Sequence, residues 1–211
     1  MEITYMGHSA FRLRGREVTI VTDPFPPSFG LQMGKVAAEI VTISHQSPNH
    51  AFVDGVANNP RVIAGPGEYE VAGVLLAGIA TASKPGEGSL NTAFVARFDD
   101  LAVCHLGDLR TKLTDQHIEE IGDIDVLLIP TGGGSTIGPQ EAAEVVTQLE
   151  PSLVIPMHYR VEGGTVGGLE AVETFCREMG QKEVAREQKL SVSRGSLTQD
   201  VRVAVLEHRR V

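Results

Sequence analysis

Hydrophobic and polar positions in the first half of the chain alternate in short runs that are typical of β-strands. The run Ile40-Val41-Thr42-Ile43 is almost continuously apolar, which indicates a strand buried on both faces. Turn-forming residues separate the runs, such as Gly15 between two of them and Pro24 after a third. The pattern predicts strands at residues 2–6, 10–13, 18–22, 40–43, 61–64, 69–72, 74–77, 91–98 and 101–104.

The second half alternates strands with amphipathic helices. Thr114 is suited to the N-cap of a short helix that ends before Gly122, and Pro139 is suited to the first turn of a second helix. Apolar residues at helical spacing between Leu169 and Met179 predict a third helix. Further strands are expected at residues 126–129, 153–155 and 201–206. Because no linker-like segment divides the chain, we expect one domain over residues 1–211, with packed sheets and helices outside.

Composition and charge narrow the classes of function. The chain has 211 residues, 42% of them hydrophobic, and a formal net charge of −9, so neither nucleic acid nor a membrane is an expected partner. No signal peptide is visible and the longest apolar run is too short to span a bilayer, so the expected compartment is the cytoplasm. Cys104 and Cys176 lie in apolar patterns and are expected to be buried free thiols. No apolar helix face marks an interface, and the oligomeric state stays open.

Histidines gather where predicted strands meet loops. Five of the seven histidines fall in four such junctions, which are Gly7-His8-Ser9, His45 to His50, His105 to Asp108, and Pro156 to Tyr159. His45 and His50 follow a buried strand on one loop, which can aim both imidazoles at one point. One such histidine is most often structural, but several at comparable positions favour a metal or catalytic site.

Several motifs, in their order along the chain, resemble the metallo-β-lactamase superfamily, and within it the small bacterial Zn-dependent hydrolases that include ascorbate-phosphate lactonase-like proteins. The resemblance covers almost the whole chain and rests on Ile3 to Ser9, Thr22-Asp23-Pro24, Gly65 to Glu70, His105 to Asp108, Pro130 to Gly133 and Ile155 to Tyr159. It implies an α/β fold, a four-layer αββα sandwich with the site at one edge of the two sheets. It also implies a hydrolase that acts on a small molecule.

The chain departs from the family's metal motif, H-x-H-x-D-H, which aligns with residues 45–50. Ser47 stands at the second His of the motif and Asn49 at its Asp. A further family His, expected near Ala82 or Ser83, is also missing. Because a Ser hydroxyl is a poor substitute for imidazole on zinc, the resemblance implies that one of the family's two metal sites is dismantled.

One metal ion at most is expected from the ligands that remain. The resemblance implies His50, Asp108 and His158 as ligands, with His45 nearby. Two imidazoles and a carboxylate are compatible with an open catalytic Zn²⁺ site, or with Fe²⁺ or Mn²⁺. A metal-free site is the alternative, because lost ligands weaken metal binding.

The candidate catalytic residues are Asp108, Asn49, His8 and Tyr159. In the family the motif Asp orients the attacking water and moves its proton, whereas Asn49 can hydrogen-bond but cannot accept a proton at neutral pH. His8 or His45 is an alternative proton shuttle, and Tyr159 either stabilises an oxyanion or packs. The hypothesis is a hydrolase of a small ester, lactone or phosphate-bearing substrate. The competing hypothesis is a catalytically inactive protein that keeps the pocket for a ligand or partner.

Three further segments have structural or functional interpretations. Asp23 is expected to fix the loop after its strand and to support the site. The glycine-rich stretch Thr131 to Thr136 is either an anion cradle or a tight turn. The polar stretch Lys84 to Ser89 is expected to form an exposed loop.

Overall fold

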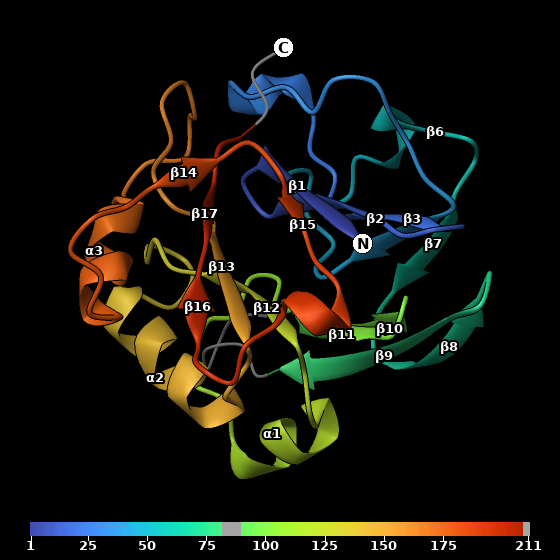
Figure 1. Ribbon diagram of the computed structural model, residues 1–211. Helices are drawn as coiled ribbons and strands as arrows, with labels where there is room; N and C mark the ends of the chain where they lie inside the picture. The colour runs from blue at the N-terminus through green and yellow to red at the C-terminus, as the bar shows by residue number, and fades with distance from the viewer. Residues whose placement is uncertain (82–89, 209–211) are drawn as a thin grey trace.

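Two β-sheets pack against each other at the centre of the computed structural model, which describes residues 1–81 and 90–208 (Figure 1). The first sheet has six strands in the order β15-β1-β2-β3-β5-β7. They are β1 (Glu2–Gly7), β2 (Ala10–Arg14), β3 (Thr19–Thr22), β5 (Ile40–Ile43), β7 (Arg61–Ala64) and β15 (Leu190–Ser191). β2 is antiparallel to both β1 and β3, and β5 and β7 are parallel to β3, so β1, β3, β5 and β7 all end at one edge.

The second sheet has seven strands in the order β16-β13-β12-β11-β10-β9-β8. They are β8 (Gly67–Val71), β9 (Val74–Thr81), β10 (Asn91–Phe98), β11 (Leu101–His105), β12 (Val126–Pro130), β13 (Leu153–Met157) and β16 (Arg202–Val203). β11, β12 and β13 are parallel and therefore also end together. Two backbone hydrogen bonds join the sheets at these ends, from His158 N to His8 O (2.9 Å) and from Thr92 N to Ser44 O (2.8 Å).

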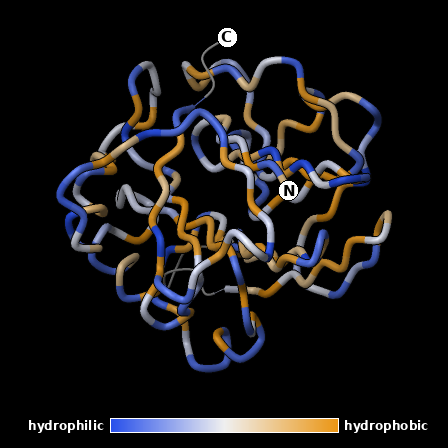
Figure 2. Tube along the Cα trace, viewed as in Figure 1, coloured by the Kyte–Doolittle hydropathy of each residue, from blue (hydrophilic) through white to orange (hydrophobic). Residues whose placement is uncertain are grey.

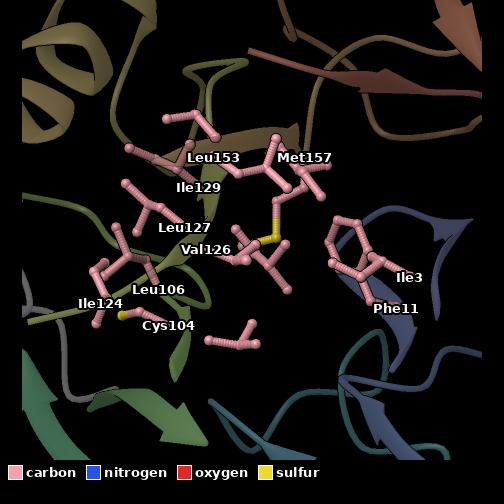
Figure 3. Packing of buried hydrophobic residues seen from close by; sticks show 14 of the residues in the cluster. Ile3, Phe11, Cys104, Leu106, Ile124, Val126, Leu127, Ile129, Leu153 and Met157 are labelled. Carbon is pink, nitrogen blue, oxygen red and sulfur yellow. The ribbon is translucent and has the colours of Figure 1, made fainter. Parts of the chain in front are cut away.

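The hydrophobic core lies between the two sheets. In β1 the side chains of Ile3 and Tyr5 are buried while Glu2 and Thr4 are partly exposed, which is the two-residue period of a strand. β11, β12 and β13 are buried at every position, because they are covered on both faces. Figure 2 shows hydrophobic colour concentrated in the central strands, and Figure 3 shows Ile3 and Phe11 on the opposite side of this core from Leu127.

The outer layers differ on the two sides. Among residues 1–81 and 90–208, three α-helices cover the seven-stranded sheet (Figure 1), and all belong to the second half of the chain. They are α1 (Asp115–Ile121), α2 (Pro139–Leu149) and α3 (Val172–Glu178). Within the described residues, the outer face of the six-stranded sheet is covered by loop side chains that include Phe25, Leu31 and Met33. The short pair β4 (Val36–Ala37) and β6 (Val56–Ala57) belongs to the same layer. The predicted α/β class and packed sheets are confirmed. The layer on the outer face of the six-stranded sheet is mostly irregular.

Most predicted elements are present, and the differences have local causes. Thr114 caps α1 by accepting a hydrogen bond from the backbone of His117 (3.3 Å), and Pro139 begins α2. α3 begins at Val172 rather than Leu169, since the backbone of Glu170 is hydrogen-bonded to Gly132 (2.8 Å). The predicted loop at residues 84–89 lies outside the described residues.

The predicted last strand, at residues 201–206, is two strands in two sheets. β16 joins the seven-stranded sheet, while β17 (Val205–Leu206) pairs with β14 (Arg186–Glu187). The two cysteines are free and buried, as predicted. None of the helices in residues 1–81 and 90–208 is long and apolar enough to cross a membrane.

Candidate metal centre

A cluster of histidines and one aspartate forms where the parallel strands of both sheets end. His8 follows β1, His45 and His50 follow β5, Asp108 lies three residues after β11, and His158 follows β13. We call these five residues the histidine–aspartate cluster. Because the carboxyl ends of parallel strands share an edge, loops far apart in the sequence meet there.

Three residues at this edge hold the left-handed backbone conformation, which is uncommon for residues other than glycine. They are His8 (φ 54°), Asp23 (φ 42°) and His158 (φ 50°). The strain is supported by hydrogen bonds, because the His8 carbonyl accepts one from the Tyr5 hydroxyl and one from the His158 amide, each at 2.9 Å. Strained conformations held by their surroundings are concentrated at functional sites.

Asp23 orients His50 from the side away from Asp108. Its Oδ2 atom accepts a hydrogen bond from Nδ1 of His50 (2.9 Å) and from the Ser44 hydroxyl (2.6 Å), while its Oδ1 accepts from the Ser44 amide (2.7 Å). Asp23 and His50 are both fully buried. In the neutral form of His50, a proton on Nδ1 that is shared with Asp23 would leave the Nε2 lone pair directed to the other side of the ring.

Asn91 anchors the backbone that carries Asp108. The Asn91 Oδ1 atom accepts a hydrogen bond from the Asp108 amide (2.8 Å), and its Nδ2 donates to the Leu106 carbonyl (2.9 Å). Gly107 sits in between with φ 57°, and a Cβ atom there would lie 2.3 Å from the Ser44 Cβ and 2.5 Å from Asn91 Oδ1. Only glycine fits this position without displacing its neighbours.

The cluster is centred on the carboxylate of Asp108. Its Oδ1 atom lies 3.2 Å from Nε2 of His50 and 3.7 Å from Nε2 of His158, and its Oδ2 lies 3.9 Å from Nδ1 of His45. The ring of His8 is close to those of His50 and His158, with centroids 4.9 and 4.6 Å apart. All the predicted histidine ligands therefore surround one aspartate.

The donor atoms of His45, His50 and Asp108 fit a metal ion. One ligand atom of each lies within 4.8 Å of the others. Within the part of the chain that the structure describes, His45 Nδ1, His50 Nε2 and Asp108 Oδ1 are buried without a hydrogen-bond partner, even though the last two are only 3.2 Å apart. Buried polar atoms without partners are costly, and nitrogen and carboxylate atoms that converge in this way suit Zn²⁺ or a similar divalent ion. His158, a ligand in the sequence-based hypothesis, contacts the same Asp108 oxygen from beside this set.

Comparisons with known proteins identify the family. The family model described as the Beta-lactamase superfamily domain matches residues 2–158. The chain belongs to the β-lactamase superfamily. A protein of this superfamily from Thermotoga maritima has a crystal structure with a TM-score of 0.81 and 39% identity, which covers 97% of each chain. A protein named as a metal-dependent hydrolase from Thermococcus onnurineus is 30% identical over 190 residues, 75% of this chain and 84% of that protein. The resemblance of the motifs to this superfamily is confirmed.

Ser47 and Asn49, which the motif resemblance aligns with two ligand positions of the superfamily, contact each other. Ser47 Oγ makes a short contact with Asn49 Oδ1, and Asn49 Nδ2 lies 2.7 Å from Nε2 of His8. These two contacts link Ser47, Asn49 and His8 to one another. A ring nitrogen engaged with Asn49 is not available to a metal ion or to a reacting proton.

The charges within the cluster set the protonation of its histidines. Although burial opposes the charged form, Asp108 and Asp23 raise the pKa of His50 to about 10. Burial, together with the nearby His158 and His50, lowers the pKa of His8 to about 3. Burial also lowers the pKa of His158. In the metal-free protein, His50 is therefore an imidazolium between two carboxylates, and a metal ion must displace its proton.

Other predicted residues have roles outside the cluster. The Tyr159 hydroxyl donates to the Leu206 carbonyl (3.2 Å), so this contact gives no support to a catalytic role. Both ring nitrogens of His105 are engaged, with the Ser9 carbonyl (2.8 Å) and the Gly107 amide (3.2 Å). The stretch from Thr131 to Thr136 forms a turn, in which the Gly133 amide donates to Ile137 (3.1 Å).

Three residues of the site were missed in the sequence. Ser44 and Asn91 act through tertiary hydrogen bonds, to Asp23 and to the backbone around Asp108, which a single sequence does not reveal. Arg110 lies two residues after Asp108, with Nη2 3.9 Å from Asp108 Oδ2. A charged residue beside the His105 to Asp108 motif was a signal that could have singled it out.

Proposed function

We propose that this protein is a hydrolase that uses one divalent metal ion, held by His45, His50 and Asp108 with His158 alongside. The observation that carries the proposal is that one ligand atom from each of His45, His50 and Asp108 lies within 4.8 Å of the others. Two imidazoles and one carboxylate leave coordination positions open, as catalytic zinc sites require, and the same set suits Fe²⁺ or Mn²⁺.

The chain's own residues prepare this centre. Asp23 holds the proton of His50 on Nδ1, so that Nε2 is presented as a ligand. Asn91 holds the loop that carries Asp108 through its amide. When bound, the ion would lower the pKa of a coordinated water and so supply a nucleophile near neutral pH. Although burial opposes its charge, His50 keeps the pKa of the Asp108 carboxylate below its usual range, so Asp108 is ionised and would serve both to hold the ion and to accept a hydrogen bond.

The loop replacements support one metal ion rather than two. Ser47 and Asn49 bind each other, and Asn49 also engages His8. Neither therefore replaces the imidazole and carboxylate of the superfamily motif. His8, with a pKa of about 3, is a weak base at neutral pH, so a proton-shuttle role for it is not part of this proposal.

A metal-free binding protein is the second candidate, and the charges at His50 favour it. Without a metal ion, the His50 imidazolium contacts Asp23 at 2.9 Å and Asp108 at 3.2 Å, so the buried charges compensate one another. In this case the same site would bind a ligand or partner without chemistry. Under both proposals the partner is a small molecule rather than nucleic acid or a membrane, and the compartment is the cytoplasm.

Metal analysis of the purified protein separates the two candidates. After incubation with Zn²⁺, Fe²⁺ or Mn²⁺ and desalting, the hydrolase proposal expects about one equivalent of metal, and less than about a tenth refutes it. The matched variant His50→Ala should lose the ion, whereas His117→Ala, at the half-buried first turn of α1, should retain it. A panel of carboxylic esters, lactones and phosphate esters then tests activity, and metal-loaded protein that is silent across it favours the binding protein.

A further inference from the structure

The ring of His8 is held in place by aromatic neighbours and by its own backbone. It lies nearly parallel to the ring of Phe29, with centroids 6.0 Å apart and 16° between the planes, and it meets the ring of Phe25 at 86°. The His8 backbone has φ 54°, and its carbonyl accepts hydrogen bonds from the Tyr5 hydroxyl and the His158 amide. Because only 5% of His8 is exposed, its ring has little room to turn, and packing sets the directions of the two ring nitrogens.

The side-chain amide of Asn49 determines which ring nitrogen of His8 carries the proton. The Asn49 oxygen contacts the Ser47 hydroxyl, so its NH₂ group is the end that faces His8, with Nδ2 2.7 Å from Nε2. An NH₂ group donates hydrogen bonds and does not accept them, so Nε2 of His8 presents its lone pair to Asn49. A neutral imidazole has one donor and one acceptor nitrogen, and the proton of His8 therefore lies on Nδ1.

The turn that carries Asn49 is closed by two backbone hydrogen bonds. The Ser47 amide donates to the His45 carbonyl and the His50 amide donates to the Ser47 carbonyl, each at 2.9 Å. The residue that orients His8 is therefore on the same short turn as two of the proposed metal ligands. Side chains on an anchored backbone bind a ligand with little loss of conformational entropy.

The Nδ1–H group of His8 is a donor that the protein does not use itself. Within residues 1–81 and 90–208, the hydrogen bonds of the His8 ring are confined to Nε2. The ring is beside the proposed metal centre, because its centroid lies 4.9 Å from that of His50 and 4.6 Å from that of His158. A fixed N–H donor next to a reacting group stabilises negative charge that develops on its oxygen.

We propose that Asn49 is a positioning residue that fixes His8 as its neutral Nδ1–H tautomer, and that this N–H group donates a hydrogen bond to an oxygen of the substrate. The inference deepens the proposed function and rests on it, because the metal centre is what brings the substrate oxygen to His8. His8 contacts the substrate as a donor and neither takes nor gives up a proton. The group that fits it is a carbonyl or phosphoryl oxygen, which gains negative charge during hydrolysis.

The first measurement is nitrogen NMR of chelator-treated protein with isotope-labelled histidine, in which the His8 signals are assigned by their loss in His8→Phe. Wild type should carry the His8 proton on Nδ1. His117 is the internal reference for the opposite tautomer, because its Nδ1 accepts a hydrogen bond from the Thr114 amide (3.2 Å). In Asn49→Asp the new side chain offers Nε2 only acceptors, so the His8 proton should move to Nε2. The control Asn58→Asp, exposed directly after β6, should leave it on Nδ1.

The second measurement adds inorganic phosphate or acetate to zinc-treated protein, as probes with acceptor oxygens. Either anion should shift the Nδ1–H signal of His8 as it binds. His8→Phe keeps an aromatic ring against Phe29 and removes the donor. In calorimetric titrations this variant should bind both anions at least about tenfold more weakly than wild type, because one hydrogen bond to a charged oxygen is lost.

The outcomes separate this inference from the proposed function. A wild-type proton on Nε2 of His8 overturns the inference, since the amide of Asn49 is then turned over. A His8 signal that neither anion shifts, or equal anion affinity in a folded His8→Phe protein, also overturns it. Metal content of the same samples tests the hydrolase proposal. If no zinc is taken up, that proposal fails, whereas an Nδ1–H signal that phosphate still shifts would support His8 as a donor to bound oxygen.

Discussion

Replacement of Asp23 by asparagine tests whether the metal centre depends on an orienting carboxylate that lies behind the ligands. Asp23 has two oxygens for three donors, which are the Ser44 amide, the Ser44 hydroxyl and Nδ1 of His50. In Asp23→Asn the new side chain would have one oxygen and a donor of its own. If its oxygen stays on the Ser44 amide, its NH₂ group opposes the proton on His50 Nδ1, and the ring must move that proton to Nε2. The nitrogen that we assign to the metal is then protonated.

The size of the effect follows from the geometry. Loss of a carboxylate that orients a ligand histidine typically costs ten- to a hundredfold in metal affinity, or about 1.4–2.7 kcal/mol. The metal-free protein also loses stability, because the buried His50 imidazolium keeps only the longer contact with Asp108 (3.2 Å). Removal of one partner of a buried ion pair costs about 3 kcal/mol or more. Both the metal affinity and the stability of Asp23→Asn should therefore fall.

Zinc affinity is measured by competition with a chromophoric chelator, and stability by urea unfolding of chelator-treated protein. The control is Asp125→Asn, because Asp125 is also buried and accepts a backbone hydrogen bond, from Ala102 (2.8 Å), at the opposite end of the strands. The control should lose stability but keep zinc affinity. Wild-type zinc affinity in a folded Asp23→Asn protein would refute the assignment of His50 Nε2 as a ligand oriented by Asp23.

Two further predictions separate the ligands and test the close packing beneath them. His50→Ala should abolish zinc binding in the chelator assay. His158→Ala, which removes a residue beside the ligand set, should lower the zinc affinity about tenfold. A larger loss of zinc affinity in His158→Ala than in His50→Ala would contradict the assignment of the ligands. Gly107→Ala should lower the free energy of unfolding by about 1–3 kcal/mol more than Gly73→Ala. Both glycines have positive φ, but of the two only Gly107 has a neighbour that a Cβ atom would strike, the Ser44 side chain at 2.3 Å. Equal losses of stability in urea unfolding would show that the loop around Gly107 relaxes.

The positions of the candidate histidines on loops at strand ends could be predicted from local sequence patterns. An apolar run followed by Pro48 and Asn49 marks the end of a strand, and His45 and His50 could be placed on the loop after it without knowledge of the partner strands. The same holds for His158 after Pro156. What brings these loops together is the parallel direction of the strands that precede them, as the pairing of β3 with β5 and of β12 with β13 shows.

Residues that support the site from a distance were beyond the reach of the sequence pattern. Asn91 begins a strand and is of a type common in turns, yet its amide joins Thr81, Leu106 and Asp108. These hydrogen bonds depend on tertiary contacts between β9, β10 and the loop after β11. The division of residues 201–206 between two sheets has the same origin, since β16 and β17 pair with partners far away in the chain.

The strained backbone at the site bears on which residues carry its function. Left-handed conformations at His8, Asp23 and His158 cost about 1–3 kcal/mol each, and neighbouring hydrogen bonds must offset that cost. At His8 the carbonyl group accepts a hydrogen bond from Tyr5, and the ring nitrogen Nε2 contacts Asn49. The ring of His8 is therefore held in place beside the site. At Asp23 the strained residue holds His50 against Asp108. Ser47 and Asn49 therefore contact His8, whereas the contacts from Asp23 through His50 to Asp108 do not involve them, and the proposed metal centre depends on this second set of contacts.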